Sequence, residues 1–411
     1  MRKLLPVLIA ALAFALPSAH AEAAPASFTF AGSGYGHGVG LSQIGAKGQA
    51  LESHTATEII KYYFPGTEVT PIEDTQTIRV NVGHQLLTAK ISLDKKFPTA
   101  SAQIFAGETT TAGLLSGRSI LAFSIMGKQI ALTSTLGSAN TPLGVSSLWT
   151  IRWDSNTSLL NLNTGTSIGL RYGYIQVRAV PITGQGYRIE ITDTMRLHDE
   201  YLYGISEVPS SWPAEAMAAQ VIASRTYALS RMNVVRKSCD CHIYSTKYDQ
   251  NYAGYSKESE VKWGTFWKSA VNATMVDESH GLVATYNASP ISIFFSSSSG
   301  GYTARSEDVW GTAYPYSVSV PDPWSIDPKL NPKYAQWVRS IPQSTMAHAF
   351  GLPDVTKYLI NSRTPTGAVL YITGYASNGT KKKLSVSDFK TAVKLPSSWF
   401  DLPASVTPAA N

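Results

Sequence analysis

The sequence predicts an α+β fold built from mixed β-sheets and a few packed helices, with a β-rich insertion toward the N-terminus. Three stretches alternate apolar and polar residues as half-buried strands do, at residues 77–82, 175–180 and 187–191. Residues 213–232 instead indicate a helix, because Pro213 lies in the first turn and six alanines follow it. Strands gathered in one part of the chain and helices in another are typical of α+β proteins.

The first residues, 1–21, have the pattern of a secretory signal peptide. Two basic residues precede an apolar run at residues 4–16, which has the length of a signal core and is too short to span a bilayer. Ala19 and Ala21 then form a small-x-small cleavage pattern. We therefore expect a secreted, extracytoplasmic protein, which would meet a membrane only through an uncleaved signal segment.

Composition narrows the function classes further. The 411 residues are 44% hydrophobic, enough for a sizeable core, whereas only 15% are charged. A polar, uncharged and aromatic-rich surface suits carbohydrate ligands, although a plain β-rich secreted protein would have the same composition. The formal charge of +6 falls to +4 without the two basic residues of the signal. No Lys/Arg stripe occurs, so a nucleic-acid partner is not expected.

The chain after the signal divides by composition into four parts. We expect a glycine-rich segment with two short helices, a β-rich region, a core that combines helices and strands, and a disordered tail, at residues 28–70, 75–198, 199–402 and 403–411. In the first part, Thr55 and Glu58 form a capping box that marks the start of the second short helix.

Within the core we predict two long helices and one hairpin. The helix at 213–232 is followed by another at about 257–275. A hairpin then joins residues 282–286 to 291–296 through a turn at 287–289, and it leads into a run of four serines and two glycines.

The glycine-dense loop at residues 32–40 does not fit a nucleotide site. No G-x-G-x-x-G spacing can be laid on it, and no strand leads through it into a helix. Glycines at this density indicate positive φ angles or close contact with a ligand. His37 and Gln43 are the polar side chains that such a loop would present, and a histidine bonded only to backbone is the alternative for His37.

The two cysteines, Cys239 and Cys241, leave three alternatives open. With His242 they supply at most three zinc ligands, at a tighter spacing than usual, and His280 is a candidate fourth. A disulfide between them would close a small ring, and two free thiols are the third alternative.

Glu207 is a candidate general acid. It precedes the helix at 213–232 and lies among Val208, Pro209 and Trp212. An apolar setting raises the pKa of a carboxyl, which a general acid near neutral pH requires. A solvated glutamate that complements the helix dipole is the alternative, and these residues alone favour it.

Several long motifs resemble the SpoIID/LytB family, which contains a sporulation peptidoglycan hydrolase and an amidase enhancer. Residues 199–230 look like its signature, and the resemblance extends over about residues 32–66 and 170–400. The other matching stretches are Q-N-Y-A-G at 250–254, S-S-S-G-G-Y-T at 297–303, E-D-V-W-G at 307–311, G-H-G-V-G-L-S-Q at 36–43 and Y-Y-F-P-G at 62–66.

The resemblance implies cleavage between N-acetylmuramic acid and N-acetylglucosamine by a lytic transglycosylase, with a glycan-binding cleft. The C6 hydroxyl of the muramic acid would attack C1, so Glu207 alone would serve as acid and then base, since ordinary glycosidases need two carboxylates. Substrate-binding positions implied by the motifs are Tyr201, Gln220, Ser297, Ser299, Asp308, His37 and Gln43. Arg225 is expected to be a structural ion-pair partner.

The family also implies an alternative and some departures. The enhancer branch implies a non-catalytic, peptidoglycan-binding module whose partner is an amidase or another wall hydrolase. The G-H-G-V-G block usually lies near the C-terminus of the family domain, so His37 and Gln43 belong to the site only if the block docks there from the N-terminus. The implied chemistry requires no cofactor. The usual cysteine pair is more widely spaced, which weakens zinc at Cys239, Cys241 and His242.

Overall fold

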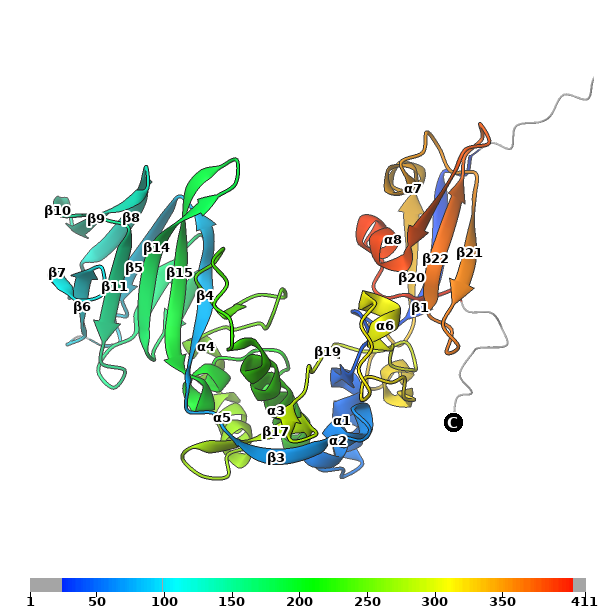
Figure 1. Cartoon of the computed structure of the whole chain (residues 1–411), viewed down its shortest axis with the longest axis horizontal. Helices are drawn as coiled ribbons and strands as arrows, with labels where there is room; N and C mark the ends of the chain where they lie inside the picture. Colours follow the sequence, from blue (N-terminus) through cyan, green and yellow to red (C-terminus); the bar gives the residue numbers. More distant parts are fainter. Residues whose placement is uncertain (1–23, 98, 402–411) are drawn as a thin grey trace, which may run out of the picture.

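A computed structural model describes residues 24–97 and 99–401 and has the α+β fold that the sequence predicts. A β-rich lobe and a smaller C-terminal lobe rise from opposite ends of a helical middle part (Figure 1). The predicted signal peptide (1–21) and disordered tail (403–411) lie outside the described residues. In the described part of the chain, no helix is long and apolar enough to cross a bilayer.

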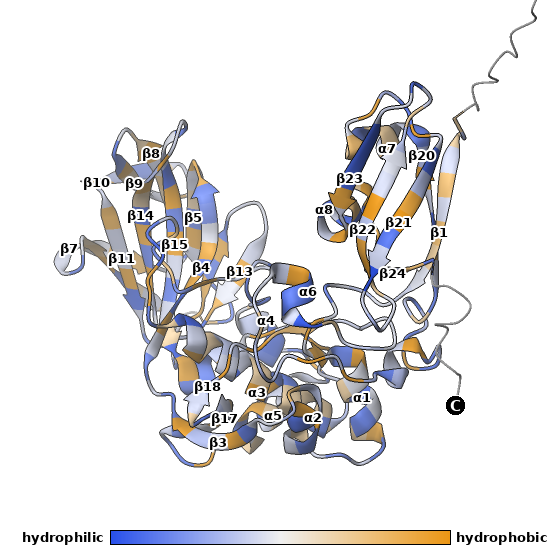
Figure 2. Cartoon of the chain, turned by 45° about the vertical axis from the view of Figure 1, so that its right-hand side comes forward, coloured by the Kyte–Doolittle hydropathy of each residue, from blue (hydrophilic) through white to orange (hydrophobic). Residues whose placement is uncertain are grey.

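The β-rich lobe consists of two sheets packed face to face. One sheet has the strand order β16-β4-β15-β14-β11-β6-β7 and the other β10-β9-β8-β5-β12-β13. Hydrophobic and hydrophilic residues alternate along several of these strands, as the banding in Figure 2 shows, which is the pattern of strands with one buried face. The strands are β4 (Thr77–Leu86), β5 (Thr88–Leu93), β6 (Ser101–Ala106), β7 (Thr110–Ser116), β8 (Ile120–Met126), β9 (Gln129–Leu136), β10 (Ala139–Ser146), β11 (Leu148–Trp153), β12 (Leu160–Asn163), β13 (Ser167–Leu170), β14 (Tyr174–Ile182), β15 (Gly186–Arg196) and β16 (Ile243–Tyr244).

Helix α3 (Ala214–Arg231) is the centre of the middle part. It begins after Pro213, as predicted, and every residue from Ala216 to Ala228 is buried. Its alanines let other elements pack closely, because they add little side-chain bulk. The elements around it are α1 (Gln43–Leu51), α2 (Ala56–Tyr63), α5 (Gly264–Ala273) and β17 (His280–Tyr286). The predicted capping box of α2 is present, with Thr55 and Glu58 each bonding the other's backbone.

The prediction of one helix at 257–275 is wrong. The segment forms α4 (Tyr255–Glu258) and α5, separated by a turn. Gly264, the first residue of α5, lies so close to the Glu258 backbone that a Cβ would collide with it. This close approach lets the chain turn back at the point where a continuous helix would run on.

The predicted hairpin is shorter than expected. β17 pairs with β18 (Ser289–Pro290) through only two residue pairs, and the turn has positive φ at Asn287 and Ala288. Pro290 has no N–H to continue the ladder. The chain instead leaves this sheet, and β19 (Phe295–Ser296) pairs in parallel with β2 (Leu41–Ser42). Residues 280–285 of β17 pair with the full length of β3 (Glu68–Glu73).

The C-terminal lobe has its own hydrophobic core, so the predicted core of 199–402 contains two. Strand β1 (Ser27–Ser33) lies between β20 (Trp337–Pro342) and β24 (Trp399–Phe400), which joins both ends of the described chain in one lobe. Phe30 packs against the rings of Phe389 and Phe400. The remaining elements are α7 (Gln343–Phe350), β21 (Lys357–Arg363), β22 (Val369–Tyr375), β23 (Lys381–Ser385) and α8 (Val386–Val393).

Candidate active site

Glu207 lies in the loop between a π-helical turn, η1 (Leu197–Tyr201), and α3. Its side chain is half-buried, next to the buried Val208. The backbone N–H of Asn251 donates a hydrogen bond of 2.6 Å to Glu207 Oε1. Asn251 also holds the preceding residue, since its Nδ2 donates to Ser206 O at 2.8 Å and its carbonyl accepts from Ser206 N–H at 2.8 Å. The segment at residues 250–252 therefore fixes one carboxyl oxygen of Glu207.

Burial raises the pKa of Glu207, and the hydrogen bond from the Asn251 N–H opposes it in part. The net direction is upward because removing a carboxylate from water costs more than this one donor recovers. A carboxyl with a raised pKa holds its proton closer to neutral pH, as a general acid must. Burial with a raised pKa is the general-acid alternative for Glu207, whereas the local residues alone had favoured a solvated glutamate.

Gln43, the first residue of α1, reaches this loop across 164 residues of sequence. Its Nε2 donates to the Glu207 carbonyl oxygen at 3.3 Å and to Gln220 Oε1 at 3.2 Å. Gln220 Nε2 in turn lies 3.2 Å from Ser224 Oγ, one turn further along α3. The N-terminal block therefore docks beside Glu207 through Gln43.

The glycine-dense loop packs against the serine-rich segment. Backbone hydrogen bonds join Tyr35 N–H to Ser298 O at 2.9 Å and Ala304 N–H to Gly38 O at 2.8 Å. Gly34 and Gly40 have φ angles of +81° and +71°, and a Cβ would run into the backbone of Ser299 at the first position and of Phe294, just before the serine-rich segment, at the second. Positive φ and close backbone contact are therefore the reason for these glycines, and the contact partner is protein.

Among the described residues, no hydrogen bond joins His37 to the Glu207 loop. Its Nδ1 accepts a hydrogen bond of 3.0 Å from Val39 N–H, and its ring packs edge-on against Trp310 with centroids 5.0 Å apart. Burial, helped by the nearby charge of Lys390, lowers the pKa of His37 to about 4, so the ring is neutral at pH 7. It lines a separate cavity on the side of the C-terminal lobe.

Three of the residues that were predicted to contact glycan are instead buried. Tyr201, Gln220 and Ser299 are at most 1% exposed and so do not line a groove. Tyr201 Oη donates to Gln250 Oε1 at 2.5 Å and stacks on Tyr252. Ser299 Oγ donates to Asp322 Oδ2 at 2.7 Å. These motif residues hold the loops of the site from beneath.

The two other positions predicted to bind glycan, Ser297 and Asp308, lie in different surroundings. Ser297 is half-buried, and its carbonyl oxygen accepts a hydrogen bond of 3.0 Å from Ile44 N–H. Asp308 forms two hydrogen bonds of 3.0 Å with Arg305 and lines the same cavity as His37. Glu207, Gln43 and Gln220 are thus brought together, whereas His37 and Asp308 belong to another part of the surface.

The zinc alternative does not fit these residues. Cys239 and Cys241 are joined in a disulfide, which removes the two thiolates that zinc would need. His242 Nδ1 accepts a hydrogen bond of 3.0 Å from Arg79 N–H. Within residues 24–97 and 99–401, no three His, Cys, Asp or Glu side chains gather in a geometry that could hold a metal. Of the three alternatives for the cysteines, the structure has the disulfide.

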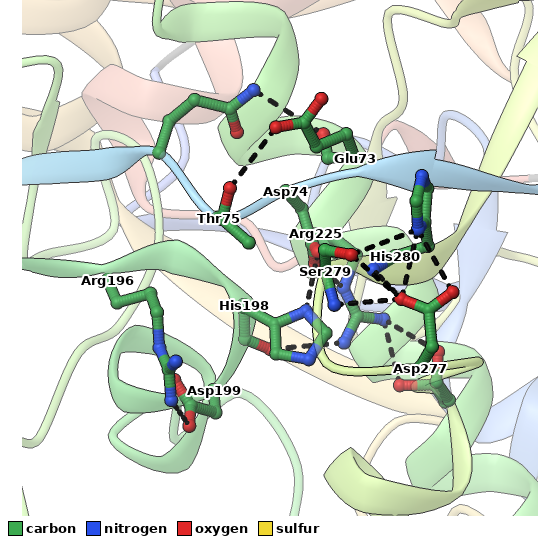
Figure 3. Close-up of polar contacts among 12 residues, drawn as sticks. Glu73, Asp74, Thr75, Arg196, His198, Asp199, Arg225, Asp277, Ser279 and His280 are labelled. Carbon is green, nitrogen blue, oxygen red and sulfur yellow. Dashed lines mark hydrogen bonds and ion pairs between the residues drawn. The ribbon is translucent and has the colours of Figure 1, made fainter.

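A buried ionic network supports α3 behind the site (Figure 3). Asp74 Oδ2 accepts from Arg225 Nε at 2.7 Å, and Asp74 Oδ1 lies 2.5 Å from His198 Nδ1. This confirms the structural role predicted for Arg225. Asp74 and His198 were not predicted, because they lie far from Arg225 in the sequence and belong to none of the motifs.

Parts of this chain that contain these motifs are similar to known proteins. The SpoIID family model, described as stage II sporulation protein, matches residues 186–286. Stage II sporulation protein D of Bacillus subtilis (strain 168) is 35% identical over 143 residues, which are 33% of this chain and 40% of that protein. The corresponding protein of Bacillus amyloliquefaciens is 33% identical over 214 residues, 49% of this chain and 59% of that protein.

The amidase enhancer of Bacillus subtilis (strain 168) is 34% identical over 125 residues, which cover 30% of this chain and 15% of the enhancer. The chain thus spans less than two thirds of the length of each of these relatives. No solved structure matches it. The family match covers β15, η1, α3, α5 and β17, the elements that carry and surround Glu207. Through residues 186–286, this chain is similar to the SpoIID family and to relatives named stage II sporulation protein D and amidase enhancer.

Proposed function

We propose that this protein is a lytic transglycosylase that cleaves peptidoglycan glycan strands between N-acetylmuramic acid and N-acetylglucosamine. The observation that carries the proposal is Glu207, whose burial raises its pKa and whose carboxyl is oriented by a single backbone donor, Asn251 N–H. A protonated carboxyl in a fixed orientation is what protonation of a glycosidic oxygen requires. A role in the cell wall is consistent with the names of the relatives.

In this mechanism Glu207 acts first as the acid. Its proton passes to the glycosidic oxygen as the bond to C1 breaks, and the N-acetylglucosamine side leaves with a free hydroxyl. The C6 hydroxyl of the same muramic acid attacks C1 and forms the 1,6-anhydro ring. The C6 proton returns to the Glu207 carboxylate, so the residue ends the cycle protonated. One carboxyl suffices because the nucleophile belongs to the substrate.

The remaining contacts support this cycle by holding the Glu207 loop. Gln43 bonds the Glu207 carbonyl oxygen, and Gln250 anchors Tyr201 beneath it. A side chain that moves by even 1 Å loses much of the benefit of its position in an active site. We assign these residues as positioning residues.

The test is digestion of purified peptidoglycan glycan strands followed by mass spectrometry of the products. The proposal predicts new anhydro-muramic ends. New reducing ends would make the protein a hydrolase, and the absence of both kinds of end would contradict glycan cleavage altogether.

A second candidate function is stimulation of a wall amidase without catalysis. It is favoured by the 34% identity to a protein named amidase enhancer. The two candidates separate on Glu207, because an enhancer does not need its carboxyl. A Glu207→Gln protein that stimulates an amidase as well as the wild type does would support the enhancer.

Both functions require export to the cell wall. We propose that residues 1–21 direct this export and are then removed, and that glycan strands and a wall hydrolase are the partners met there. N-terminal sequencing of the protein from a culture supernatant or a wall fraction tests this. A mature start after Ala21 supports it, and a retained Met1 contradicts removal.

A further inference from the structure

A cavity of about 260 Å³ lies between α6 (Ser306–Trp310) and the C-terminal lobe. Figures 1 and 2 both place α6 directly below α8. One wall comes from His37 and α6, and the other from β22, the start of α8 and the loop before β24. Glu207 does not line this cavity, so it is distinct from the candidate active site.

The α8 wall carries a positive charge that no acid of the described chain neutralises. Lys390 Nζ donates to Gly36 O at 2.9 Å, and it forms no ion pair within residues 24–97 and 99–401. An ammonium group has three donors, so this contact leaves donors for a ligand. Burial lowers the pKa of Lys390, as expected for an ammonium group that is removed from water without a carboxylate beside it.

The α6 wall carries an excess negative charge. Arg305 makes a bidentate pair with Asp308, at 3.0 Å for each hydrogen bond. Glu307 Oε1 lies 3.4 Å from the same guanidinium, and no hydrogen bond to this carboxylate occurs in the described part of the chain. Two carboxylates therefore share one cation, and Glu307 is the one left with acceptor capacity. His37 adds no charge, because its lowered pKa keeps it neutral at pH 7.

The space between these walls suits a small and partly apolar group. Val309, Val369 and Val386 contribute apolar surface, and Ser387 and Ser398 add hydroxyl groups. Pockets for drug-sized molecules start at about 300 Å³, so this cavity fits one or two amino-acid residues.

We propose that this cavity binds the end of a short peptide that carries both a free amino group and a free carboxylate. The amino group would lie toward Glu307, which shares the Arg305 cation with Asp308, and the carboxylate toward Lys390, so that each end of the peptide meets an opposite charge. A bound peptide would bridge the SpoIID part of the chain and the C-terminal lobe. If the proposed function holds, the peptides attached to wall glycan are the source of this ligand. The source therefore rests on the proposed function, whereas the charge pattern of the cavity does not.

Isothermal titration calorimetry tests the proposal. The probe is a tripeptide that ends in a diamino acid, and it is used in three forms. The first is unmodified, the second has its side-chain amine acetylated, and the third has its carboxylates amidated. The free tripeptide is expected to bind wild-type protein at least tenfold more tightly than either blocked form. Glu307→Gln should remove the preference over the acetylated form, and Lys390→Gln should remove the preference over the amidated form.

Matched controls separate this effect from a general change of charge or a loss of folding. Glu278→Gln and Lys382→Gln alter exposed residues outside the cavity and should keep both preferences. Thermal melts verify that Lys390→Gln, which also changes the contact to Gly36, remains folded, and the Glu307→Gln result stands without it. Equal affinity for all three tripeptides, or no binding to wild-type protein, would overturn the proposal.

The source of the peptide and the proposed function are tested separately. A disaccharide carrying the same tripeptide should bind more tightly than the free tripeptide if wall glycan is the source, and equal affinity would contradict that source. Glu207→Gln protein should bind the tripeptide as wild type does. Tripeptide binding without any glycan cleavage would therefore overturn only the proposed function.

Discussion

The N–H of Asn251 donates a hydrogen bond of 2.6 Å to Glu207 Oε1, across 44 residues of sequence. This bond has two opposite effects. It fixes the direction of the carboxyl, and it stabilises the charged form, which lowers the pKa. Burial nevertheless raises the pKa of Glu207 overall. The site thus gains orientation without losing the protonated form that a general acid needs.

The pH dependence of cleavage follows from this balance. Because Glu207 must be protonated at the start of each cycle, kcat/KM should be highest below its raised pKa and should fall as pH rises through it. The falling limb is expected above the ordinary pKa of a glutamic acid, about 4.3. Initial rates of anhydro-end release across pH 4 to 9 check this. A rate that rises steadily over the whole range would contradict an acid role for Glu207.

Gln43→Leu tests the docking of the N-terminal block. The substitution removes the donor that bonds Glu207 O and Gln220 Oε1, and it leaves Gln220 with a buried unpaired oxygen. We expect kcat to fall about tenfold with KM little changed, and the free energy of unfolding to fall by about 1–3 kcal/mol. Gln129→Leu, on an exposed strand position, is the matched control. An unchanged kcat in the folded Gln43→Leu protein would show that the block does not position Glu207.

Asp74→Asn tests the network of Figure 3. Arg225 is fully buried, and Asp74 is its only carboxylate partner among the described residues. Loss of this charge should lower the free energy of unfolding by about 3–5 kcal/mol, because an unpaired buried charge remains. Urea unfolding gives the value. Asp277→Asn, at the exposed Asp277–His280 pair in the same figure, should change it little, and a similar loss in both variants would argue against the special role of Asp74.

Asp193 makes stability depend on pH. It is fully buried on β15, and burial, with the charge of Glu200 second, raises its pKa well above the ordinary value. The folded protein therefore keeps a proton that the unfolded chain releases above about pH 3.9, so stability falls as pH rises from there toward the folded pKa.

Asp193→Asn removes this titration and should raise Tm more at pH 8 than at pH 5. Each kcal/mol recovered corresponds to about 2–4 °C. Differential scanning calorimetry at the two pH values checks the difference. An equal change of Tm at both pH values would contradict a buried neutral Asp193.

Local patterns carried much of the fold prediction. The alternation at residues 77–82 marks β4, Pro213 marks the start of α3, and the Thr55–Glu58 capping box marks α2, because each signal acts within a few residues. The break between α4 and α5 was missed, since it depends on how closely Gly264 approaches the Glu258 backbone. The pairing of β1 with β20 and β24 spans the whole chain, so no local pattern records it.

The site was predictable in part for the same reason. Glu207 and Gln43 lie in recognisable motifs. Gln43 was predicted to belong to the site only if the N-terminal block docks beside Glu207, and the hydrogen bond between the two residues meets that condition. Asn251 bonds the Glu207 carboxyl through its backbone N–H, which every residue except proline has, so its side-chain type does not indicate this contact. Tyr201 and Ser299 lie in the same motifs, but their burial shows that a motif position can support a loop as well as contact a ligand.

The most direct test of the central claim compares wild type with Glu207→Gln on purified glycan strands. The substitution keeps the size of the side chain and its capacity to accept the Asn251 hydrogen bond, but it cannot deliver a proton. We predict that release of anhydro-muramic ends falls by at least a hundredfold, the contribution typical of acid–base catalysis, while the melting temperature stays near that of the wild type. Release of anhydro ends by Glu207→Gln at the wild-type rate would contradict the account.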